Sequence, residues 1–281
     1  MSMLTLDMTL VDEIILRALR EDMPMGDLTT DSTIPEAQEA SARIIAKEDG
    51  VVAGLPVFMR VFTLLDPHAS FNLLVEEGAT VTKGTVLMTF GGNARALLKA
   101  ERTALNLLQR MSGIATMTHA FAAAFAGTRT KIVDTRKTVP GLRYLDKYAV
   151  RAGGGTNHRY CLSDGVLIKD NHIKASGGIT AAVSRARAVA PHTIRIEVET
   201  ENMDMVREAL EAGADIIMLD NMTDAQMTEA VALVAGRALT EASGNVTVDR
   251  AGRIAATGVD LVSSGALTHS VRAMDISMRF D

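Results

Sequence analysis

The sequence predicts an α/β protein with a parallel sheet in its second half. From residue 130 onward, six short segments rich in aliphatic and β-branched residues alternate with segments of helical spacing. Most of these expected strands end in a polar residue, and 21 to 35 residues separate one such end from the next. Short buried strands joined by helices are typical of a parallel sheet with right-handed crossovers.

The polar strand ends favour a barrel over an open sheet. The expected strands lie at 130–134, 164–170, 193–199, 214–220, 238–243 and 259–264, and their polar ends are Asp134, Lys169, Glu199, Asp220, Ser243 and Ser264. An α/β barrel collects active-site groups from the ends of all its strands, whereas a doubly wound open sheet collects them at one switch point. Because the polar ends are spread evenly over six strands, an incomplete (β/α) barrel is favoured, with the open sheet as the alternative.

The first half of the chain predicts a scaffold of helices and short strands. Residues 9–20 have the spacing of an amphipathic helix, with Thr9 as its N-cap. Short strands are expected at 42–50, 51–59, 71–79 and 85–92. Residues 94–126 form a long helical pattern that carries Arg102 on its polar face, with Gly113 as a point where it can break.

Composition limits the class of protein. The chain has 281 residues, 47% hydrophobic and 22% charged, which fits one large or two ordinary folded domains and excludes a disordered chain. The chain as a whole has a net charge of −5, which argues against a nucleic-acid-binding protein. The chain has a single cysteine, Cys161, and no secretion signal, which predicts a cytoplasmic protein. It has no apolar run of ~18 residues, so no membrane span is expected.

Positive charge is concentrated in one part of the chain. Residues 129–174 carry ten basic and four acidic residues, net +6, so the remainder sums to −11. This indicates a localised anionic ligand, with chance clustering on the surface as the alternative. If Lys137, Arg159 and Lys169 share one rim, their repulsion of roughly 1–4 kcal/mol per pair favours a ligand with several negative charges.

Two carboxylates at neighbouring strand ends predict a metal site. Glu199 and Asp220 are hard oxygen donors that suit Mg²⁺, which proteins often hold through one or two carboxylates and substrate phosphates. An ion pair with a neighbouring strand is the alternative. Glu197 shares the side-chain parity of Glu199 and is expected one layer deeper.

Small residues after two late strands predict a phosphate site. Ser-Gly turns lie at 243–245 and 264–266, although such turns are also common without a ligand. A polyanionic substrate, a divalent metal and a cationic pocket together fit phosphoribosyl transfer, in which charge develops on a leaving pyrophosphate. No Ser/His/Asp order or Cys/His pair indicates acyl transfer.

Three segments in order resemble a known enzyme family. They are DTRKTVPGLR (134–143), KYAVRAGGGTNHR (147–159) and LIKDNHI (167–173), and EDMPMGDLTT (21–30), EVE (197–199), LDN (219–221), EASGNV (241–246) and SSGALTHS (263–270) agree with them. The chain resembles quinolinate phosphoribosyltransferase, also called nicotinate-nucleotide pyrophosphorylase (carboxylating). The resemblance implies transfer of phosphoribosyl from phosphoribosyl pyrophosphate to quinolinate, with Mg²⁺, giving nicotinate mononucleotide, pyrophosphate and CO₂ in de novo NAD synthesis.

The resemblance also implies the domain organisation and a shared site. It implies an N-terminal α/β sandwich (1–112), an incomplete α/β barrel (113–270) and a C-terminal segment (271–281) that can pack back on the sandwich. It further implies a homodimer, or a higher oligomer, in which Arg102 reaches the barrel of the partner subunit.

Site residues follow from the resemblance position by position. Arg136, His158, Arg159 and Lys169, with Arg102, are implied to hold the quinolinate carboxylates, and Thr135 to position the cationic turn. Lys137 is implied to contact pyrophosphate, and Glu199 and Asp220 to lie near the ribose hydroxyls and Mg²⁺. The implied catalytic residues are Lys137, Lys169, Glu199 and Asp220. The implied phosphate contacts are Ser243, Gly244, Asn245, Ser264, Gly265, Ala266 and His269.

Two alternative functions are carried forward. One is a related phosphoribosyltransferase of the molybdenum-operon type with another substrate. The other is a barrel lyase that uses Lys169 as a Schiff base, which needs an apolar or cationic setting around the lysine. His172 is given no site role.

Overall fold

The computed structural model describes residues 5–281, and their contacts divide the chain into two compact units. Residues 1–4 of the expected sandwich domain lie outside the described residues. Unit 1 comprises Met1–His119, Thr138–Gly154 and Leu267–Asp281, and unit 2 comprises Ala120–Lys137 and Gly155–Ala266. The domain boundaries at 112 and 270 stay predictions.

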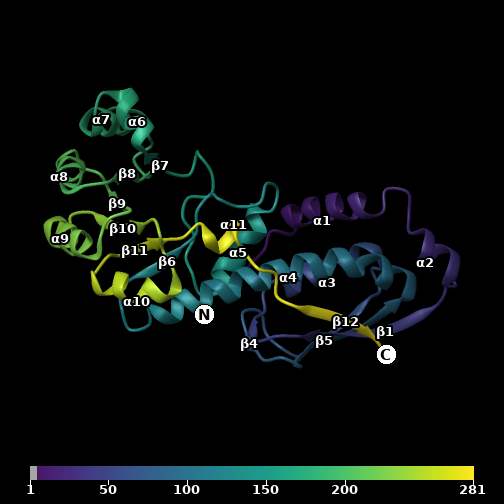
Figure 1. Ribbon diagram of the computed structural model, residues 1–281. Coiled ribbons are helices and arrows are strands. Elements are labelled where there is room, and N and C mark those ends of the chain that lie inside the picture. The colour runs from purple at the N-terminus through teal and green to yellow at the C-terminus, as the bar shows by residue number, and fades with distance from the viewer. Residues whose placement is uncertain (1–4) are drawn as a thin grey trace. The chain divides into compact units, whose positions relative to one another are not determined.

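Unit 1 is built on an antiparallel sheet of four strands with helices against it (Figure 1). The sheet order is β12-β1-β5-β3, and β12 from the C-terminal end pairs antiparallel with β1. The elements are α1 (Met8–Asp22), α2 (Leu28–Thr33), β1 (Glu39–Ala46), β2 (Gly50–Val51), α3 (Leu55–Leu65), β3 (Ser70–Leu73), β4 (Thr80–Val81), β5 (Val86–Asn93), α4 (Ala94–Ala124), α5 (Arg143–Ala152), α11 (Ala266–His269) and β12 (Ile276–Phe280).

Helix α3 corrects one sequence expectation. Residues 51–59 were expected to form a strand, but a helix begins at Leu55, after Gly54 in a left-handed conformation with φ 103° and with a proline in the first turn. A short apolar run fits a buried strand and a buried helix equally well. Phe58 and Phe62, one turn apart, pack with their ring centroids 4.9 Å apart and form the aromatic core of the unit.

The helical expectations at 9–20 and 94–126 are confirmed, with two local corrections. Asp7, not Thr9, caps α1, because its side chain accepts a hydrogen bond from the Thr9 amide. Helix α4 continues through Gly113 without a break. A Cβ atom at this position would lie 2.2 Å from the Arg272 carbonyl oxygen, so glycine permits a close backbone approach.

Unit 2 contains a six-stranded parallel sheet in the order β6-β11-β10-β9-β8-β7. Helices α7, α8, α9 and α10 lie along one side of it (Figure 1). The elements are β6 (Lys131–Val133), β7 (Val166–Ile168), α6 (Asp170–Ser176), α7 (Ile179–Val189), β8 (Ile196–Thr200), α8 (Met203–Glu211), β9 (Ile216–Asp220), α9 (Asp224–Val234), β10 (Leu239–Ser243), α10 (Val248–Ala256) and β11 (Leu261–Ser263).

The strand order confirms the incomplete barrel. Consecutive strands are neighbours from β7 to β11, and β11 then pairs with β6, as in a closing barrel. Strands β6 and β7 do not pair with each other in the sheet of the described residues. Instead, Thr156 forms a single parallel bridge with Val133, so the segment after residue 155 runs beside β6.

No helix within residues 5–281 combines the length and the apolar character that crossing a bilayer requires. The cytoplasmic location stays a prediction.

Candidate active site

A cavity of about 310 Å³ lies in unit 2, lined by residues in the second half of the parallel strands and in the loops that follow them. This is the edge at which α/β barrels place active sites. The lining residues are Thr135, Arg136, Lys137, His158, Arg159, Leu167, Lys169, Met218, Glu241, Ser243 and Ser263. The cavity therefore gathers four basic side chains from segments that lie up to 33 residues apart in the sequence.

A buried carboxylate fixes the loop that follows Thr156. Asp134, fully buried at the end of β6, accepts hydrogen bonds from Asn157 Nδ2 at 2.6 Å and from the His158 amide at 2.9 Å. Arg159 is held at its other end, because its Nη1 donates to the Gly165 carbonyl at 2.8 Å. Burial and the nearby Arg136 together lower the pKa of Arg159 below its usual value.

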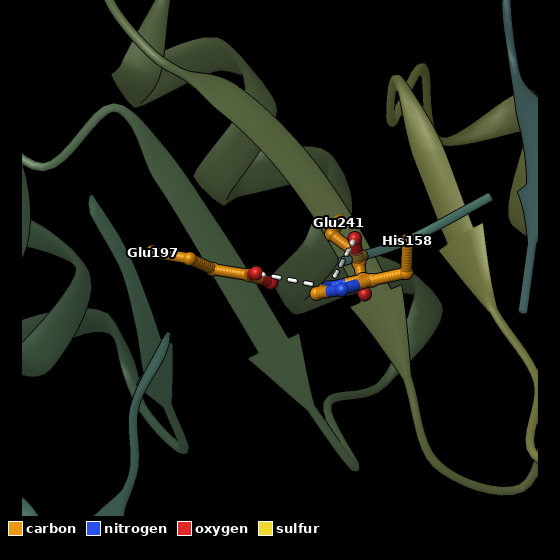
Figure 2. Close-up of side chains that lie close together, drawn as sticks. All are labelled: His158, Glu197 and Glu241. Carbon is orange, nitrogen blue, oxygen red and sulfur yellow. Dashed lines mark ion pairs between the residues drawn. The ribbon is translucent and has the colours of Figure 1, made fainter. Parts of the chain in front are cut away.

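His158 connects this loop to two buried glutamates (Figure 2). Its Nε2 lies 3.0 Å from Glu197 Oε2 and 3.8 Å from Glu241 Oε2. Its Nδ1 accepts a hydrogen bond from the Arg159 amide at 2.7 Å, so the ring carries its proton on Nε2 and donates it towards Glu197. Burial, followed by the charge of Glu197, raises the pKa of Glu241 to about 8.

Lys169 and Glu199 form an ion pair at the ends of adjacent strands β7 and β8. The Nζ and Oε2 atoms are 2.5 Å apart, and the lysine side chain is 46% exposed while the glutamate is 13% exposed. The Lys169 amide donates to His172 Nδ1 at 2.9 Å in the capping box of α6. His172 therefore caps the helix that follows Lys169.

Asp220 and Ser243 end adjacent strands and lie opposite each other in the register of β9 and β10. Gly244 and Asn245 follow Ser243 in left-handed conformations. The Ser264 amide donates to the Val133 carbonyl at 3.1 Å, which places the second Ser-Gly turn beside the end of β6.

Two family models cover most of the chain. Residues 27–112 match the quinolinate phosphoribosyl transferase N-terminal domain, and residues 114–279 match the C-terminal domain of the same family. The chain belongs to the quinolinate phosphoribosyltransferase family.

Relatives of this phosphoribosyltransferase cover nearly its whole length. A probable nicotinate-nucleotide pyrophosphorylase (carboxylating) of Bacillus subtilis (strain 168) is 47% identical over 258 residues, 92% of this chain and 89% of the relative. A mitochondrial quinolinate phosphoribosyltransferase (decarboxylating) 2 of Nicotiana glauca is 45% identical over 96% of this chain and 82% of its own. The crystal structure of NadC from Streptococcus pyogenes superimposes with a TM-score of 0.94, at 45% identity, over 98% of this chain and 97% of that one.

The structure brings together many of the predicted site residues of this family member. Those that line the cavity are Thr135, Arg136, Lys137, His158, Arg159, Lys169 and Ser243. Glu199 joins them through its ion pair with Lys169, and Asp220 lies opposite Ser243. Gly244, Asn245, Ser264, Gly265 and Ala266 follow the ends of β10 and β11 in the same unit. Arg102 and His269 belong to unit 1.

Sequence reasoning missed two carboxylates in this site. Glu241 lines the cavity and Asp134 supports the loop beside it, but neither was assigned a site role. The sequence does contain a signal for Glu241. It is an acidic residue inside a short apolar strand, and it lies two residues before Ser243, so both side chains face the same side of the sheet. Glu197 had been placed one layer below Glu199, and it is 3% exposed.

The donor sets differ in how well they suit Mg²⁺. Glu199 and Asp220 offer oxygen atoms, and both residues are partly exposed, which suits an ion that keeps several waters. His158, Glu197 and Glu241 also place their ligand atoms within 4.8 Å of one another, but they include an imidazole nitrogen and are largely buried. The pair at the strand ends is therefore the better match for Mg²⁺.

Proposed function

We propose that this protein transfers the phosphoribosyl group of phosphoribosyl pyrophosphate to quinolinate and releases pyrophosphate and CO₂. The product is nicotinate mononucleotide, a precursor in de novo NAD synthesis. The observation that carries the proposal is the cavity in which Arg136, Lys137, Arg159 and Lys169 converge. Family membership supports the same activity.

In this proposal the cations select a planar dianion and orient it. Arg136 and Arg159 have forked guanidinium groups that match carboxylates, and Lys169 adds a point charge. With both carboxylates held, the pyridine nitrogen faces the anomeric carbon of the ribose. The nitrogen–carbon bond forms as the bond to pyrophosphate breaks, and Lys137 contacts the departing pyrophosphate.

Decarboxylation follows from the charge that this bond creates. When the 2-carboxylate leaves as CO₂, the released electron pair stays on the ring carbon, where the positive charge of the adjacent quaternised nitrogen stabilises it, and a proton then binds to this carbon. Positioning and electrostatic stabilisation account for most of the rate enhancement in such a site. Glu199 and Asp220, as negative groups near the ribose, stabilise positive charge on the anomeric carbon.

We propose Mg²⁺ as the cofactor, held by Glu199 and Asp220 directly or through water and the ribose hydroxyls. When bound, the ion supplies positive charge that stabilises the pyrophosphate leaving group. The turns at 243–245 and 264–266, with His269, are proposed to contact the phosphates. The position of the two turns supports this assignment, because they follow the ends of β10 and β11, where barrels often bind phosphate.

The proposed homodimer explains the position of Arg102. This exposed residue lies on α4 and lines a second cavity, in unit 1, together with Asp27, Leu28 and Lys99. Leu28 is 86% exposed and nearby Met25 is 99% exposed, which suits a surface that a second copy covers. We propose that Arg102 completes the quinolinate site of the partner subunit.

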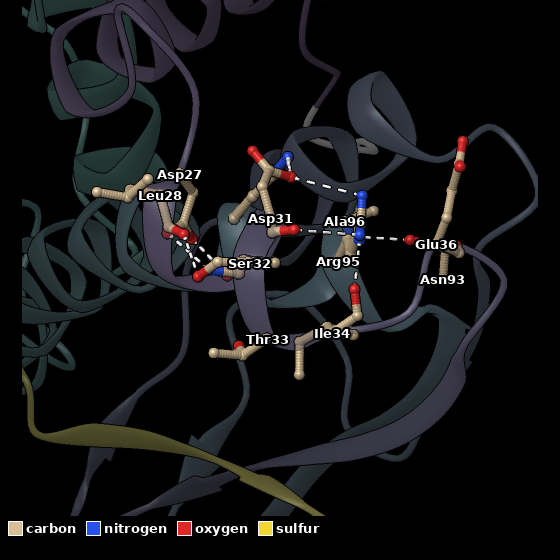
Figure 3. Close-up of polar contacts among 12 residues, drawn as sticks. Asp27, Leu28, Asp31, Ser32, Thr33, Ile34, Glu36, Asn93, Arg95 and Ala96 are labelled. Carbon is tan, nitrogen blue, oxygen red and sulfur yellow. Dashed lines mark hydrogen bonds and ion pairs between the residues drawn. The ribbon is translucent and has the colours of Figure 1, made fainter.

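The segment beside Arg102 is firmly attached to α4 (Figure 3). Lys99 Nζ donates to Asp31 Oδ1 at 2.6 Å, and Arg95 Nε donates to the Ile34 carbonyl at 2.8 Å. Asn93 Nδ2 donates to the Glu36 carbonyl at 2.7 Å. These bonds hold α2 and the segment that follows it against α4 and the residue before it.

A direct assay decides the function. Purified protein is mixed with quinolinate, phosphoribosyl pyrophosphate and Mg²⁺, and formation of nicotinate mononucleotide is followed by chromatography. Product formation supports the proposal, and its absence with quinolinate but presence with another pyridine or pyrimidine acid overturns the substrate. The Schiff-base alternative is disfavoured because the Lys169 ammonium is held in an ion pair with Glu199, whereas a Schiff base needs a lysine amine that is free to attack a carbonyl carbon.

A further inference from the structure

Asn221 follows β9 directly after Asp220, in a backbone conformation that side chains rarely adopt. Its φ is 54°, and among residues 5–281 it shares positive φ with two other non-glycine residues, Ala235 and Asn245. Left-handed backbone at a residue other than glycine carries an energetic cost that persists where surrounding contacts enforce it. Two of these three residues, Asn221 and Asn245, lie at the strand ends beside the proposed ribose and phosphate contacts.

The side chain of Asn221 connects these two strand ends. Its Nδ2 donates to Asp220 Oδ2 at 2.8 Å, and its Oδ1 accepts from Asn245 Nδ2 at 3.3 Å. Its backbone amide donates to the Ser243 carbonyl at 2.9 Å and extends the ladder between β9 and β10. Because a carboxylate can only accept, Asp220 fixes which end of the Asn221 amide faces it, and Asn245 must then donate to the other end.

Gly244 makes this arrangement possible. A Cβ atom at residue 244 would lie 2.1 Å from Asn221 Oδ1, and the backbone there has φ 86°. A larger residue would therefore displace the Asn221 amide as well as strain its own backbone. The turn sequence and the Asn221 side chain fit each other as one unit.

We propose that Asn221 is a positioning residue that locks the Asp220 carboxylate to the 243–245 turn. This inference rests on the proposed function, in which Asp220 faces the ribose and the turn faces the 5′-phosphate. One amide then sets the spacing between two parts of the same substrate, phosphoribosyl pyrophosphate. Loss of this amide affects that substrate and leaves the quinolinate cations unchanged, because Asn221 is not among the residues that line their cavity.

The test compares Asn221→Gly with Ala235→Gly. Glycine accepts the left-handed conformation at both sites, so we expect the midpoint of thermal unfolding to change by no more than about 3 °C in each variant. Ala235 is the C-cap that follows α9, and it provides the matched control. Residues that orient a ligand-binding group typically cost 10–100-fold when removed, so Asn221→Gly should raise the KM for phosphoribosyl pyrophosphate about tenfold or more. The KM for quinolinate should stay within about twofold, and Ala235→Gly should change neither KM.

A second variant separates the effect of losing the Asn221–Asp220 hydrogen bond from the effect of losing the size of the Asn221 side chain. Asn221→Asp keeps the size and the tolerance of positive φ, but it places a second carboxylate against Asp220 in place of a donor. We expect it to raise the KM for phosphoribosyl pyrophosphate at least as much as the glycine variant. Wild-type KM in either variant, or an equal rise in both substrates' KM values, overturns the inference.

A binding experiment distinguishes failure of the positioning role of Asn221 from failure of the proposed function. If the wild type forms no nicotinate mononucleotide, the proposed function fails. Binding of ribose 5-phosphate in the presence of Mg²⁺, measured by calorimetry, then tests Asn221 without turnover. Weaker binding by Asn221→Gly than by wild type and Ala235→Gly supports the positioning role, and equal or absent binding in all three overturns it.

Discussion

The Glu241→Gln substitution should make stability less dependent on pH between about 5 and 8. Glu241 is fully buried, and its pKa of about 8 in the folded protein exceeds the ordinary value of 4.5, first through burial and then through the charge of Glu197. Between these values the unfolded chain loses the proton while the folded protein keeps it. The free energy of unfolding therefore falls as pH rises, because the raised pKa stabilises the fold fully only below 4.5.

The size of the effect follows from the same interval. One pH unit corresponds to about 1.4 kcal/mol, so the loss from pH 4.5 to about 8 reaches at most about 5 kcal/mol. Even half of this figure shifts the unfolding midpoint by about 5 °C or more. Glutamine has the shape of the protonated acid and no charge, so the variant should gain stability over the wild type as pH rises.

Thermal unfolding of both proteins at pH 5, 6.5 and 8 measures this gain. Glu229→Gln, at an exposed position of α9, is the control and should follow the wild type at each pH. A difference between Glu241→Gln and wild type that is constant across this range would refute the assignment of the proton to Glu241.

Three further predictions test the site and the fold. Arg136→Ala should lower kcat/KM for quinolinate by about 10- to 100-fold, because it removes a charge-assisted contact, and unchanged turnover contradicts its role. Arg102→Ala should regain activity when mixed with a Lys169→Ala protein, since a hybrid of the proposed dimer contains one intact shared site, and a mixture without any recovery argues against sharing. Arg110→Met removes the bidentate partner of fully buried Asp146, so urea unfolding should show a loss of about 3–5 kcal/mol, whereas a change below about 1 kcal/mol contradicts the pairing.

The parallel sheet could be predicted because each strand is short, apolar and bounded by polar residues. All six expected strands of the second half are present, and the helices expected after several of them are present too. Strand ends alone suggest one rim for Lys137, Arg159 and Lys169, the family resemblance adds Arg136, and all four line one cavity. These features depend on local pattern and on the rule that barrel sites form at strand ends.

The features that sequence could not provide depend on contacts between distant segments. The apolar run from 51 onward has no periodicity that separates strand from helix, so α3 was missed. The contact of His158 with Glu241 joins a loop to a strand 83 residues later, and only the register of the sheet places them together. The bond between Asn221 and Asn245 depends on backbone conformations that sequence patterns do not report.

The structure also changes the electrostatic argument that first indicated an anionic ligand. In the sequence alone, repulsion among Lys137, Arg159 and Lys169 favours a ligand with several negative charges. The protein supplies part of the negative charge itself, because Glu199 pairs with Lys169 at 2.5 Å. The negative charge of Glu197 also offsets part of the lowering that burial and Arg136 impose on the pKa of Arg159. Under the proposed function, a dianionic substrate competes with Glu199 for Lys169 rather than meeting an uncompensated charge. In this proposal the Lys169–Glu199 ion pair joins the two substrate sites, because Lys169 is assigned to quinolinate and Glu199 to the ribose and metal side.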